Sequence, residues 1–488
     1  MAHLIGRDFT PPDIRAKVTG RAKYAEDFRA DGMLFCRLLT SPMPHGRVRS
    51  IDLSEARNMA GVIGILTADE LPEASAPGNT ILTNEPLYVG APILAVAAES
   101  ETAAQNAIAA IEMDLEPLPF CVDPLESLRP GGPNARTDGN VVRRGEGVVE
   151  LKWTAEDFAA GGQGQMPMGE PLAEWSYGDV EAGFANAALV LDETFVTAGT
   201  SHHSMEPRSA MAYWQNGKCF VYGSTQSQAY VVPGLASLLG IEQEDLVYVA
   251  EFCGGGFGSK GGAYPVMAIP AYMARKTGRP VLMRISRAEE NFVGSARPAF
   301  QGRIKIGFET NGRITAADLY IVQSNGPNSG GGDYNSAGSA MSLVYTPPAM
   351  RFRGLPVLTN TPPTGAQRGP GQNQLATAVE PIIDKAAREL GLDLLAIRRI
   401  NAPDNNSGYG ATQGPLTSTY QREALDLGAE QFGWEARRAR SGQRRGSKVT
   451  GVAVGQAFHG AGSNGFDGLL RIAPDGKLII HTGVGNLG

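Results

Sequence analysis

The sequence contains few cysteines, and they lie far apart. Its 488 residues include only four, Cys36, Cys121, Cys219 and Cys253. Disulfide frameworks, zinc sites and iron–sulfur clusters need closely or regularly spaced cysteines, and this spacing offers none. We therefore expect buried free thiols in a reducing compartment, and the predicted location is cytoplasmic.

Long apolar runs and excess positive charge are also missing. The longest apolar stretches, such as Val89–Ala98, are far below the roughly 20 residues that cross a bilayer, and the first residues, MAHLIGRDF, do not form a basic and apolar leader. The net charge is −7, and the densest basic cluster, Arg437–Arg445, contains no aromatic residue. The sequence therefore predicts no membrane span and no nucleic-acid partner.

Glycine, by contrast, is abundant. It accounts for 62 of the 488 residues, which is a larger share than the usual value of about 7%. Much of it lies in short loops. Such loops let the backbone approach a ligand closely. The chain also exceeds the roughly 250 to 300 residues at which single cores stop growing, so we expect more than one domain.

The first 125 residues alternate between strand and helix patterns. Met33–Leu39 and Gly61–Leu66 predict strands, and Ser100 is a suitable N-cap for a helix after it. Residues 126–175 combine glycine, proline and charge with weak periodicity, which predicts a long connection over the surface. We therefore expect a compact α+β domain over 1–125, followed by a domain boundary.

A larger region of helices and strands follows the boundary. Strands are expected over Leu189–Ala198 and Val247–Phe252. Helices are expected over Gln228–Leu239, ended by Gly240, and over Leu375–Leu390, ended by Gly391. Near the end of the sequence, a new set of strands is expected over Gly451–Phe458, Gly468–Ile472 and Lys477–Thr482.

The strongest chemical signal is a glycine-rich turn, EFCGGGFGSK, at Glu251–Lys260. Consecutive glycines permit positive φ angles and let backbone N–H groups converge on an anionic ligand. The turn is not a P-loop, because Gly261 follows Lys260 where a serine or threonine would contact Mg²⁺. It is also a poor dinucleotide-binding fingerprint, and taken by itself it is more typical of a structural or unspecific loop.

Several other motifs accompany this turn in a fixed order: Gly20–Asp27, Ser41–Arg47, Glu85–Gly90, His202–Pro207, Ser224–Gln226 and Gly365–Gly371. Together they resemble the xanthine oxidase, aldehyde oxidase and carbon monoxide dehydrogenase family over nearly the whole chain. The resemblance implies an α+β fold in four parts. These are a hammerhead-type domain (1–125), a connecting segment (126–175), the first molybdopterin-binding domain (176–445) and the incomplete beginning of a second (446–488).

The resemblance also implies which residues bind the cofactor: Gln226, Gly255, Gly256, Phe257, Gly258 and Arg368. The Gln226 side chain and the Phe257 N–H would lie beside the oxo and sulfido ligands of molybdenum, and the glycines would let the loop close on the pterin. Arg368 would place a permanent cation near this anionic centre. None of them binds the metal directly, since the family holds molybdenum through the sulfurs of its pterin.

Neighbouring residues are assigned other roles. His202 and His203 would point to opposite faces of a strand and are not expected to hold a metal, and Glu206, before a proline, is interpreted as structural. Gly261 and Pro370 replace an acidic and an aromatic residue of purine-oxidising members, which disfavours a purine substrate. Gly369 replaces the copper-binding cysteine of carbon monoxide dehydrogenases, which argues against a copper site.

The implied reaction is hydroxylation of an aldehyde, an N-heteroaromatic or a related electron-poor carbon, with water as the oxygen source. The family's catalytic glutamate lies on a segment beyond the motif at Thr482–Gly488, so no catalytic residue is expected in this chain. We therefore expect the chain to be inactive without the polypeptide that carries the rest of the subunit. A pterin-binding protein without turnover and an orphan fragment remain alternatives.

The cofactor implied by the resemblance is molybdenum with molybdopterin, either in the simple form or as the cytosine dinucleotide. Because the cysteines are not clustered, [2Fe–2S] centres must lie on a partner subunit. FAD is expected on a flavin subunit, or a cytochrome takes its place as electron acceptor. The small-molecule substrate would complete the set of partners.

Overall fold

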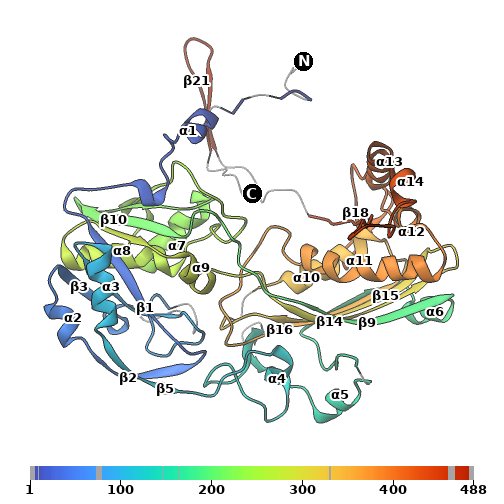
Figure 1. Cartoon of the computed structure of the whole chain (residues 1–488), viewed down its shortest axis with the longest axis horizontal. Helices are drawn as coiled ribbons and strands as arrows, with labels where there is room; N and C mark the ends of the chain where they lie inside the picture. The colour runs from blue at the N-terminus through green and yellow to red at the C-terminus, as the bar shows by residue number, and fades with distance from the viewer. Residues whose placement is uncertain are drawn as a thin grey trace. The chain divides into compact units, whose positions relative to one another are not determined.

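The computed structural model describes residues 6–8, 10–11, 13–72, 80–144, 147–162, 164–328, 331–459 and 468–482 (Figure 1). The chain divides into two compact units. Unit 1 comprises Met1–Leu118, Ser201–Ser295 and Gly465–Gly488, and unit 2 comprises Pro119–Thr200 and Ala296–Asn464. The four-part division inferred from the sequence follows family domains along the chain and remains a prediction.

Unit 1 is built on a seven-stranded sheet with strand order β12-β11-β10-β13-β1-β4-β3. The strands are β1 (Leu34–Thr40), β3 (Val62–Thr67), β4 (Pro92–Ala98), β10 (Ser209–Gln215), β11 (Lys218–Gly223), β12 (Leu246–Val249) and β13 (Val281–Arg284). β1 pairs with β4 in antiparallel and with β13 in parallel orientation. Strands from the first 118 residues therefore share one sheet with strands from residues 209–284.

Two helices cover one face of this sheet: α7 (Gln228–Leu239) and α8 (Pro265–Thr277). Their side chains, among them Leu235 and Met267, form one core with strand residues such as Val281. α7 ends at Gly240, which has a φ of +63°, and α8 begins with a proline at its first turn, where the missing N–H costs nothing. The helix predicted over Gln228–Leu239 is confirmed with its bounds.

Smaller elements complete unit 1: α1 (Ile14–Val18), η1 (Ala25–Asp27), β2 (Gly46–Asp52), α2 (Ser54–Asn58), η2 (Ala68–Glu70), α3 (Glu101–Ala109), β5 (Glu112–Pro117), η3 (Gln243–Asp245), α9 (Arg287–Val293), β21 (Gly468–Ile472) and β22 (Leu478–Thr482). Ser100 caps α3 as predicted, since its side chain accepts a hydrogen bond from the Ala103 N–H. The strands predicted near β1 and β3 are confirmed to within one residue at either end.

Unit 2 contains a five-stranded sheet with strand order β8-β16-β15-β14-β9. The strands are β8 (Ala173–Tyr177), β9 (Leu189–Thr197), β14 (Phe300–Phe308), β15 (Ile314–Ser324) and β16 (Met350–Val357). Helices α10 (Asp333–Val344) and α11 (Gln372–Glu389) lie on one side of it, and the segment with α4 (Pro124–Leu128) and α5 (Ala155–Ala159) lies on the other (Figure 1). The sheet is therefore covered on both faces.

Part of the segment 126–175 packs into the core of unit 2, so the prediction that it only runs over the surface is wrong for these residues, whereas β7 (Gly147–Glu150) is exposed throughout. Leu128 and Trp153 are buried and pack with Tyr320 and Val322 of β15. The alternate residues of β15 pack on the opposite side, under α10 and α11. Weak periodicity concealed this burial, because short irregular pieces need only a few apolar side chains to cover a sheet face.

The remaining elements of unit 2 are short: β6 (Val141–Arg144), β7 (Gly147–Glu150), α6 (Val180–Ala185), α12 (Leu394–Ile400), β17 (Gly408–Tyr409), β18 (Gly414–Pro415), α13 (Gln421–Phe432), α14 (Trp434–Arg438), β19 (Arg444–Arg445) and β20 (Lys448–Val449). The strand predicted over Gly451–Phe458 is wrong, because this stretch has no regular structure. Within the described ranges, no helix is long and apolar enough to cross a membrane.

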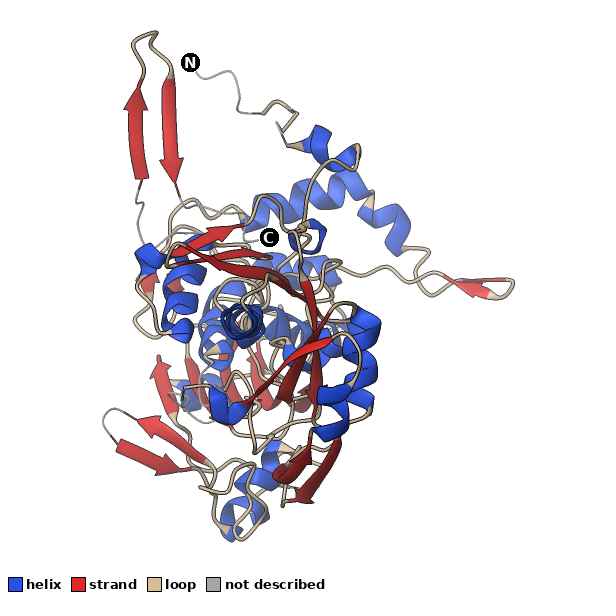
Figure 2. Ribbon diagram, turned by 90° about the vertical axis from the view of Figure 1, so that its left-hand side faces the viewer, coloured by secondary structure: helices blue, strands red, loops and turns tan. Residues whose placement is uncertain are grey.

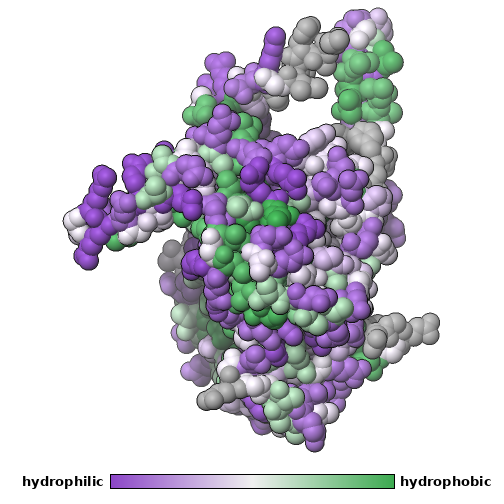
Figure 3. All heavy atoms as spheres, turned by 90° about the vertical axis from the view of Figure 1, so that its right-hand side faces the viewer, coloured by the Kyte–Doolittle hydropathy of each residue, from purple (hydrophilic) through white to green (hydrophobic). Residues whose placement is uncertain are grey.

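The strands expected at Gly468–Ile472 and Lys477–Thr482 form a hairpin of β21 and β22, drawn as two paired strands in Figure 2. Its apolar side chains are exposed: Leu469, Leu470, Ile472, Leu478 and Ile480 are each at least 57% accessible, and Figure 3 shows them as an apolar patch. An isolated two-stranded hairpin is at best marginally stable in water. The predicted loop at Gly483–Gly488 lies outside the described residues.

Candidate functional site

The glycine-rich turn connects β12 to α8 in unit 1. Gly255 and Gly258 have φ angles of +104° and +112°, and Phe257 between them has a φ of +53°. A left-handed backbone is strained for a residue with a side chain, and such strain tends to concentrate at functional sites. Gly255 and Gly258 thus have the positive φ angles for which glycine was predicted. Phe257 also has a positive φ, although it is not glycine.

Three successive backbone donors of this turn are unused. Within the described part of the chain, the N–H groups of Gly255, Gly256 and Phe257 meet no acceptor. Buried or half-buried N–H groups are nearly always paired, and consecutive donors in alternating backbone conformations form a concave anion site. The turn therefore presents the donors that an anionic or oxygen-rich ligand would need.

Gln226 lies against the same turn, although 32 positions separate it from Gly258. It stands between β11 and α7, is 8% exposed, and its Oε1 accepts a hydrogen bond of 2.9 Å from the Gly258 N–H. A Cβ added at Gly256 would overlap with this oxygen. The structure thus brings together two of the predicted segments and explains why residue 256 must be glycine.

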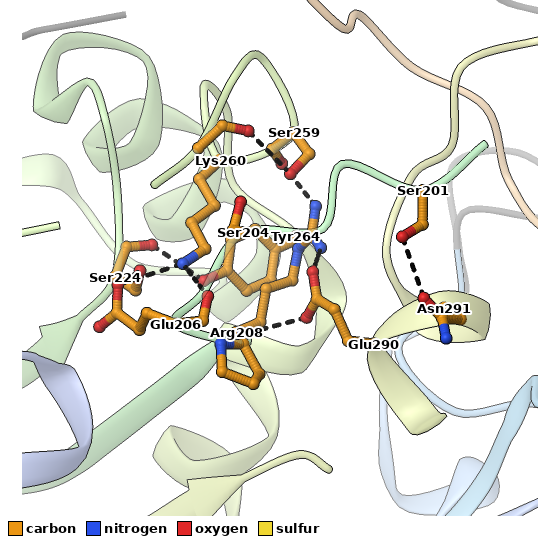
Figure 4. A network of polar contacts seen from close by, with 12 residues as sticks. Ser201, Ser204, Glu206, Arg208, Ser224, Ser259, Lys260, Tyr264, Glu290 and Asn291 are labelled. Carbon is orange, nitrogen blue, oxygen red and sulfur yellow. Dashed lines mark hydrogen bonds and ion pairs between the residues drawn. The ribbon is translucent and has the colours of Figure 1, made fainter. Parts of the chain in front are cut away.

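A buried ion pair lies beneath the turn (Figure 4). The Lys260 ammonium is 3.1 Å from Glu206 Oε2 and donates to the Glu206 carbonyl at 2.6 Å. Lys260 is fully buried and Glu206 is 7% exposed. Glu206 Oε2 also accepts from the Gly254 N–H at 2.7 Å and from the Ser224 hydroxyl at 2.6 Å.

A second buried pair, Arg208 with Glu290 of α9, stands next to the first (Figure 4). The other end of the Arg208 guanidinium donates to the Ser259 carbonyl at 2.6 Å, so this pair also contacts the turn. The Tyr264 hydroxyl donates to the Ser224 carbonyl at 2.9 Å, and burial raises the pKa of this phenol well above its usual value. The turn therefore rests on charged and polar side chains rather than on an apolar core.

Cys253 is the one predicted buried thiol that is only partly buried, whereas Cys36, Cys121 and Cys219 are buried and all four are free. Burial raises the pKa of the Cys253 thiol, and the Lys260 ammonium opposes that shift. The group is therefore a protonated thiol at neutral pH, not an activated nucleophile.

Arg368 lies in unit 2, on the loop that precedes α11. Its side chain is exposed, and its carbonyl accepts a 2.7 Å hydrogen bond from the buried guanidinium of Arg297. Arg297 also donates to the Gly369 carbonyl and to the side chains of Gln367 and Gln374. Burial lowers the pKa of Arg297, against the raising effect of Asp333.

The predicted convergence of Gln226 and Arg368 on one centre concerns residues of different units, and it stays a prediction. The two histidines do not lie on a strand: His202 is buried, whereas His203 is exposed with a φ of +50°. No three histidine, cysteine or acidic side chains of the described residues are arranged to hold a metal ion.

Two protein families match the chain. The family described as the molybdopterin cofactor-binding domain matches residues 165–402, and the a/b hammerhead domain of aldehyde oxidase and xanthine dehydrogenase matches residues 19–119. The chain therefore is an α+β protein with a hammerhead domain and a molybdopterin cofactor-binding domain. It belongs to the xanthine dehydrogenase and aldehyde oxidase family of molybdenum-dependent oxidoreductases.

Individual relatives agree with this assignment. A protein of Bacillus subtilis, described as a probable subunit of xanthine dehydrogenase, is 31% identical over 80% of this chain and 50% of its own length. The nicotinate dehydrogenase large molybdopterin subunit of Eubacterium barkeri is 28% identical over 82% of this chain and 89% of its own length. The aldehyde oxidoreductase of Desulfovibrio desulfuricans has the same fold, with a TM-score of 0.81 at 21% identity over 98% of this chain and 52% of that one.

The chain thus spans about half the length of several relatives that it matches. The residues around the turn fit a molybdopterin group. Besides the three open N–H groups, the Ser204 hydroxyl is buried near Gly255 and meets no partner among the described residues. A metal carried by the sulfurs of a pterin needs donors for its oxygen ligands rather than a cage of side chains, and this turn offers donors.

Sequence reasoning missed the residues that hold the two loops in place. Lys260 served only to exclude a P-loop, and Arg208, Glu290 and Arg297 were not singled out. Glu206 was interpreted as structural, and its four hydrogen-bonded neighbours, Ala25, Ser224, Gly254 and Lys260, agree with that role. For Glu206 and Lys260 the available signal was a charged residue inside a quoted motif, but its partner could not be found from spacing, and the other three residues lie outside every quoted motif.

Proposed function

We propose that this chain is the molybdopterin-binding part of a molybdenum hydroxylase, and that its glycine-rich turn faces the cofactor. The observation that carries the proposal is the row of three open N–H donors at Gly255, Gly256 and Phe257, next to the amide of Gln226. When bound, the cofactor supplies oxygen transfer from water coupled to two-electron oxidation. The chain's own residues orient the cofactor and stabilise charge on its oxygen ligands.

Each predicted site residue has a role in this proposal. Gly255, Gly256 and Gly258 let the backbone lie close to the pterin. Phe257, whose backbone has a positive φ, donates through its N–H. Gln226 contributes a neutral amide, whose oxygen is fixed by Gly258. Arg368 contributes a permanent cation, and the hydrogen bond from the Arg297 guanidinium to the Arg368 carbonyl holds its backbone in place.

The substrate class is an aldehyde, an N-heteroaromatic or a related electron-poor carbon. Relatives with aldehyde and nicotinate in their names support this range. The cofactor is molybdopterin, either in the simple form or as the cytosine dinucleotide. The proposed cell compartment is the cytoplasm, and the four free cysteines support it. Electrons leave through an iron–sulfur subunit and a flavin subunit or cytochrome.

The rest of the large subunit, with the catalytic glutamate, is proposed to reside on another polypeptide. The nicotinate dehydrogenase relative supports this arrangement, since its name denotes one molybdopterin subunit and the match covers 89% of it. The exposed apolar hairpin of β21 and β22 offers a surface for such a partner. A pterin-binding protein without turnover and an orphan fragment are the alternatives.

Two substitutions in the assembled enzyme test the proposal. Gln226→Ala should lower kcat/KM. The expected loss of transition-state stabilisation is about 2 to 4 kcal/mol, as for the loss of one oxyanion-type donor. Arg368→Lys should also be costly, because a flexible ammonium cannot replace a planar fork. The control is Arg388→Lys on α11, whose side chain is 71% exposed. Unchanged kinetics and molybdenum content in both variants would show that the site is elsewhere.

A further inference from the structure

We propose that Lys260 and Glu206 are positioning residues, and that their buried ion pair holds Gln226 and the glycine-rich turn in a single register. The inference rests on the proposed function of that turn, and it assigns a task to two residues that touch no substrate. Figure 4 shows the pair side by side, with Lys260 reaching across from the turn to Glu206.

Lys260 acts through both of its ends. Its ammonium donates to the carbonyl and to a carboxylate oxygen of Glu206, at 2.6 and 3.1 Å. Its own carbonyl accepts from the Gln226 N–H at 3.1 Å and from the Thr225 hydroxyl at 2.8 Å. One residue thus joins the backbone beside Gln226 to the segment of Glu206.

Glu206 joins three further segments. Its oxygens accept hydrogen bonds from the Ala25 N–H at 3.2 Å, the Ser224 hydroxyl at 2.6 Å and the Gly254 N–H at 2.7 Å. Its backbone N–H donates to the Gly254 carbonyl at 3.1 Å. Gly254 begins the run of glycines and Lys260 ends the turn, so hydrogen bonds of Glu206 and Lys260 hold both ends of the glycine run.

The register of the turn decides where its open donors point. The Gly258 N–H donates to Gln226 Oε1, and the carbonyl of Lys260, two positions later, accepts from the Gln226 N–H. A shift by one residue would move every one of these donors away from its acceptor. Burial makes such a shift costly, since the ammonium would then lie inside the protein without the carboxylate.

Stability alone does not account for a buried pair. Replacing both charges with neutral groups is often neutral or stabilising, whereas removing one partner leaves an uncompensated charge. The best-attested use of buried ionic groups is to specify one arrangement over its alternatives. The hydrogen bonds that Lys260 and Glu206 make to both ends of the turn are such a specification.

The test is amide hydrogen exchange, followed by mass spectrometry, on the full chain without cofactor. The variants are Lys260→Met, Glu206→Gln and the two combined. We expect each single change to lower the unfolding temperature, and the double variant to regain part of that loss. Exchange in the peptide spanning the turn should rise at least tenfold in the Lys260→Met variant and stay raised in the double variant.

The control is the ion pair of buried Arg398 with partly buried Glu380 in unit 2, with 2.6 Å between guanidinium and carboxylate; the same guanidinium also lies 2.8 Å from Asp384. Arg398→Met, Glu380→Gln and their combination should change stability but leave exchange in the turn unchanged. A single charge change can prevent folding, so Thr225→Val provides a milder variant. It removes the hydroxyl that donates to the Lys260 carbonyl, and it should raise exchange in the turn by a smaller factor. Wild-type exchange in the double variant, or an equal rise with the control pair, would overturn the proposal.

A second readout separates this inference from the proposed function. In the assembled enzyme, the double variant should retain less molybdenum and show a lower kcat with little change in KM. If exchange rises in the turn while molybdenum content stays at the wild-type level, the pair positions the turn but the turn does not face the cofactor. In that outcome the proposed function fails and the positioning role stands.

Discussion

Gly256 is a residue at which one added methyl group should have a measurable effect. A methyl group at this position would overlap with Gln226 Oε1, so the hydrogen bond between Gln226 and Gly258 would break. Gly256→Ala should therefore cost about 1 to 3 kcal/mol of unfolding free energy, the usual range for overpacking. Urea denaturation would measure it.

Gly262 provides the matched control, because a Cβ there meets nothing within 4 Å. Gly262→Ala should leave stability unchanged or raise it by up to about 1 kcal/mol through the unfolded state. Equal effects at the two positions would mean that Gln226 does not occupy the place described.

Cys253 permits a test that needs no mutation. Because burial raises the pKa of its thiol, less thiolate is present at any given pH than in a free cysteine. Alkylation by iodoacetamide should therefore be slow near neutral pH and accelerate as the pH rises into the alkaline range. Labelling rates read by mass spectrometry of the Cys253 peptide would check this.

Two other cysteines serve as internal standards in the same sample. Burial raises the pKa of Cys36 and of Cys219 to about 12, so both should stay unlabelled until the protein unfolds. Fast labelling of Cys253 at neutral pH would contradict the described burial of the turn.

At the scale of elements, a buried arginine holds the loop that carries Arg368. The Arg297 guanidinium serves four acceptors on residues 367–374, the last of them in the first turn of α11. Arg297→Met removes the donor that these acceptors share, although Gln374 Oε1 still accepts from the Gly371 N–H. It should cost about 3 kcal/mol of unfolding free energy, since each unpaired buried group costs about 1 to 3 kcal/mol.

A positive charge at position 297 is not by itself sufficient to hold the loop that carries Arg368. Arg297→Lys keeps a cation but cannot reach four acceptors at once, so it should recover only part of the loss. Full recovery by lysine, measured by urea denaturation, would mean that charge rather than the fork holds the loop. The exposed Arg388→Met on α11 should change stability by less than about 0.5 kcal/mol.

At the scale of the whole molecule, the prediction concerns assembly. The chain spans about half the length of several relatives, and we expect no hydroxylase activity from it alone. Mixing it with a polypeptide that carries the rest of the large subunit should restore turnover of an aldehyde or N-heteroaromatic. The hairpin of β21 and β22 should then become protected from hydrogen exchange.

The decisive measurement is a steady-state assay of the purified chain, with molybdenum content determined in parallel. Turnover by the chain alone, with molybdenum bound and no partner present, would refute the assembly prediction. A complex that forms without protection of the hairpin would place the contact surface elsewhere.

Local features of this protein were determined by the sequence itself. The helix Gln228–Leu239 and its glycine end follow from apolar spacing and from the left-handed residue that only glycine adopts freely, both of which act within a few residues. The same holds for the positive φ angles of Gly255 and Gly258. Motifs in order along the chain were sufficient to predict the family.

Only the tertiary structure decided which distant residues meet. The seven-stranded sheet joins residues 34–98 to 209–284, the segment 126–175 covers a sheet face, and Lys260 finds its partner 54 positions away in Glu206. No local pattern encodes such pairs, because a charged side chain bonds to whatever the closed chain brings near it. The geometry of the site belongs to these long-range contacts, and for that reason the sequence could name Gln226 and the turn but not what holds them together.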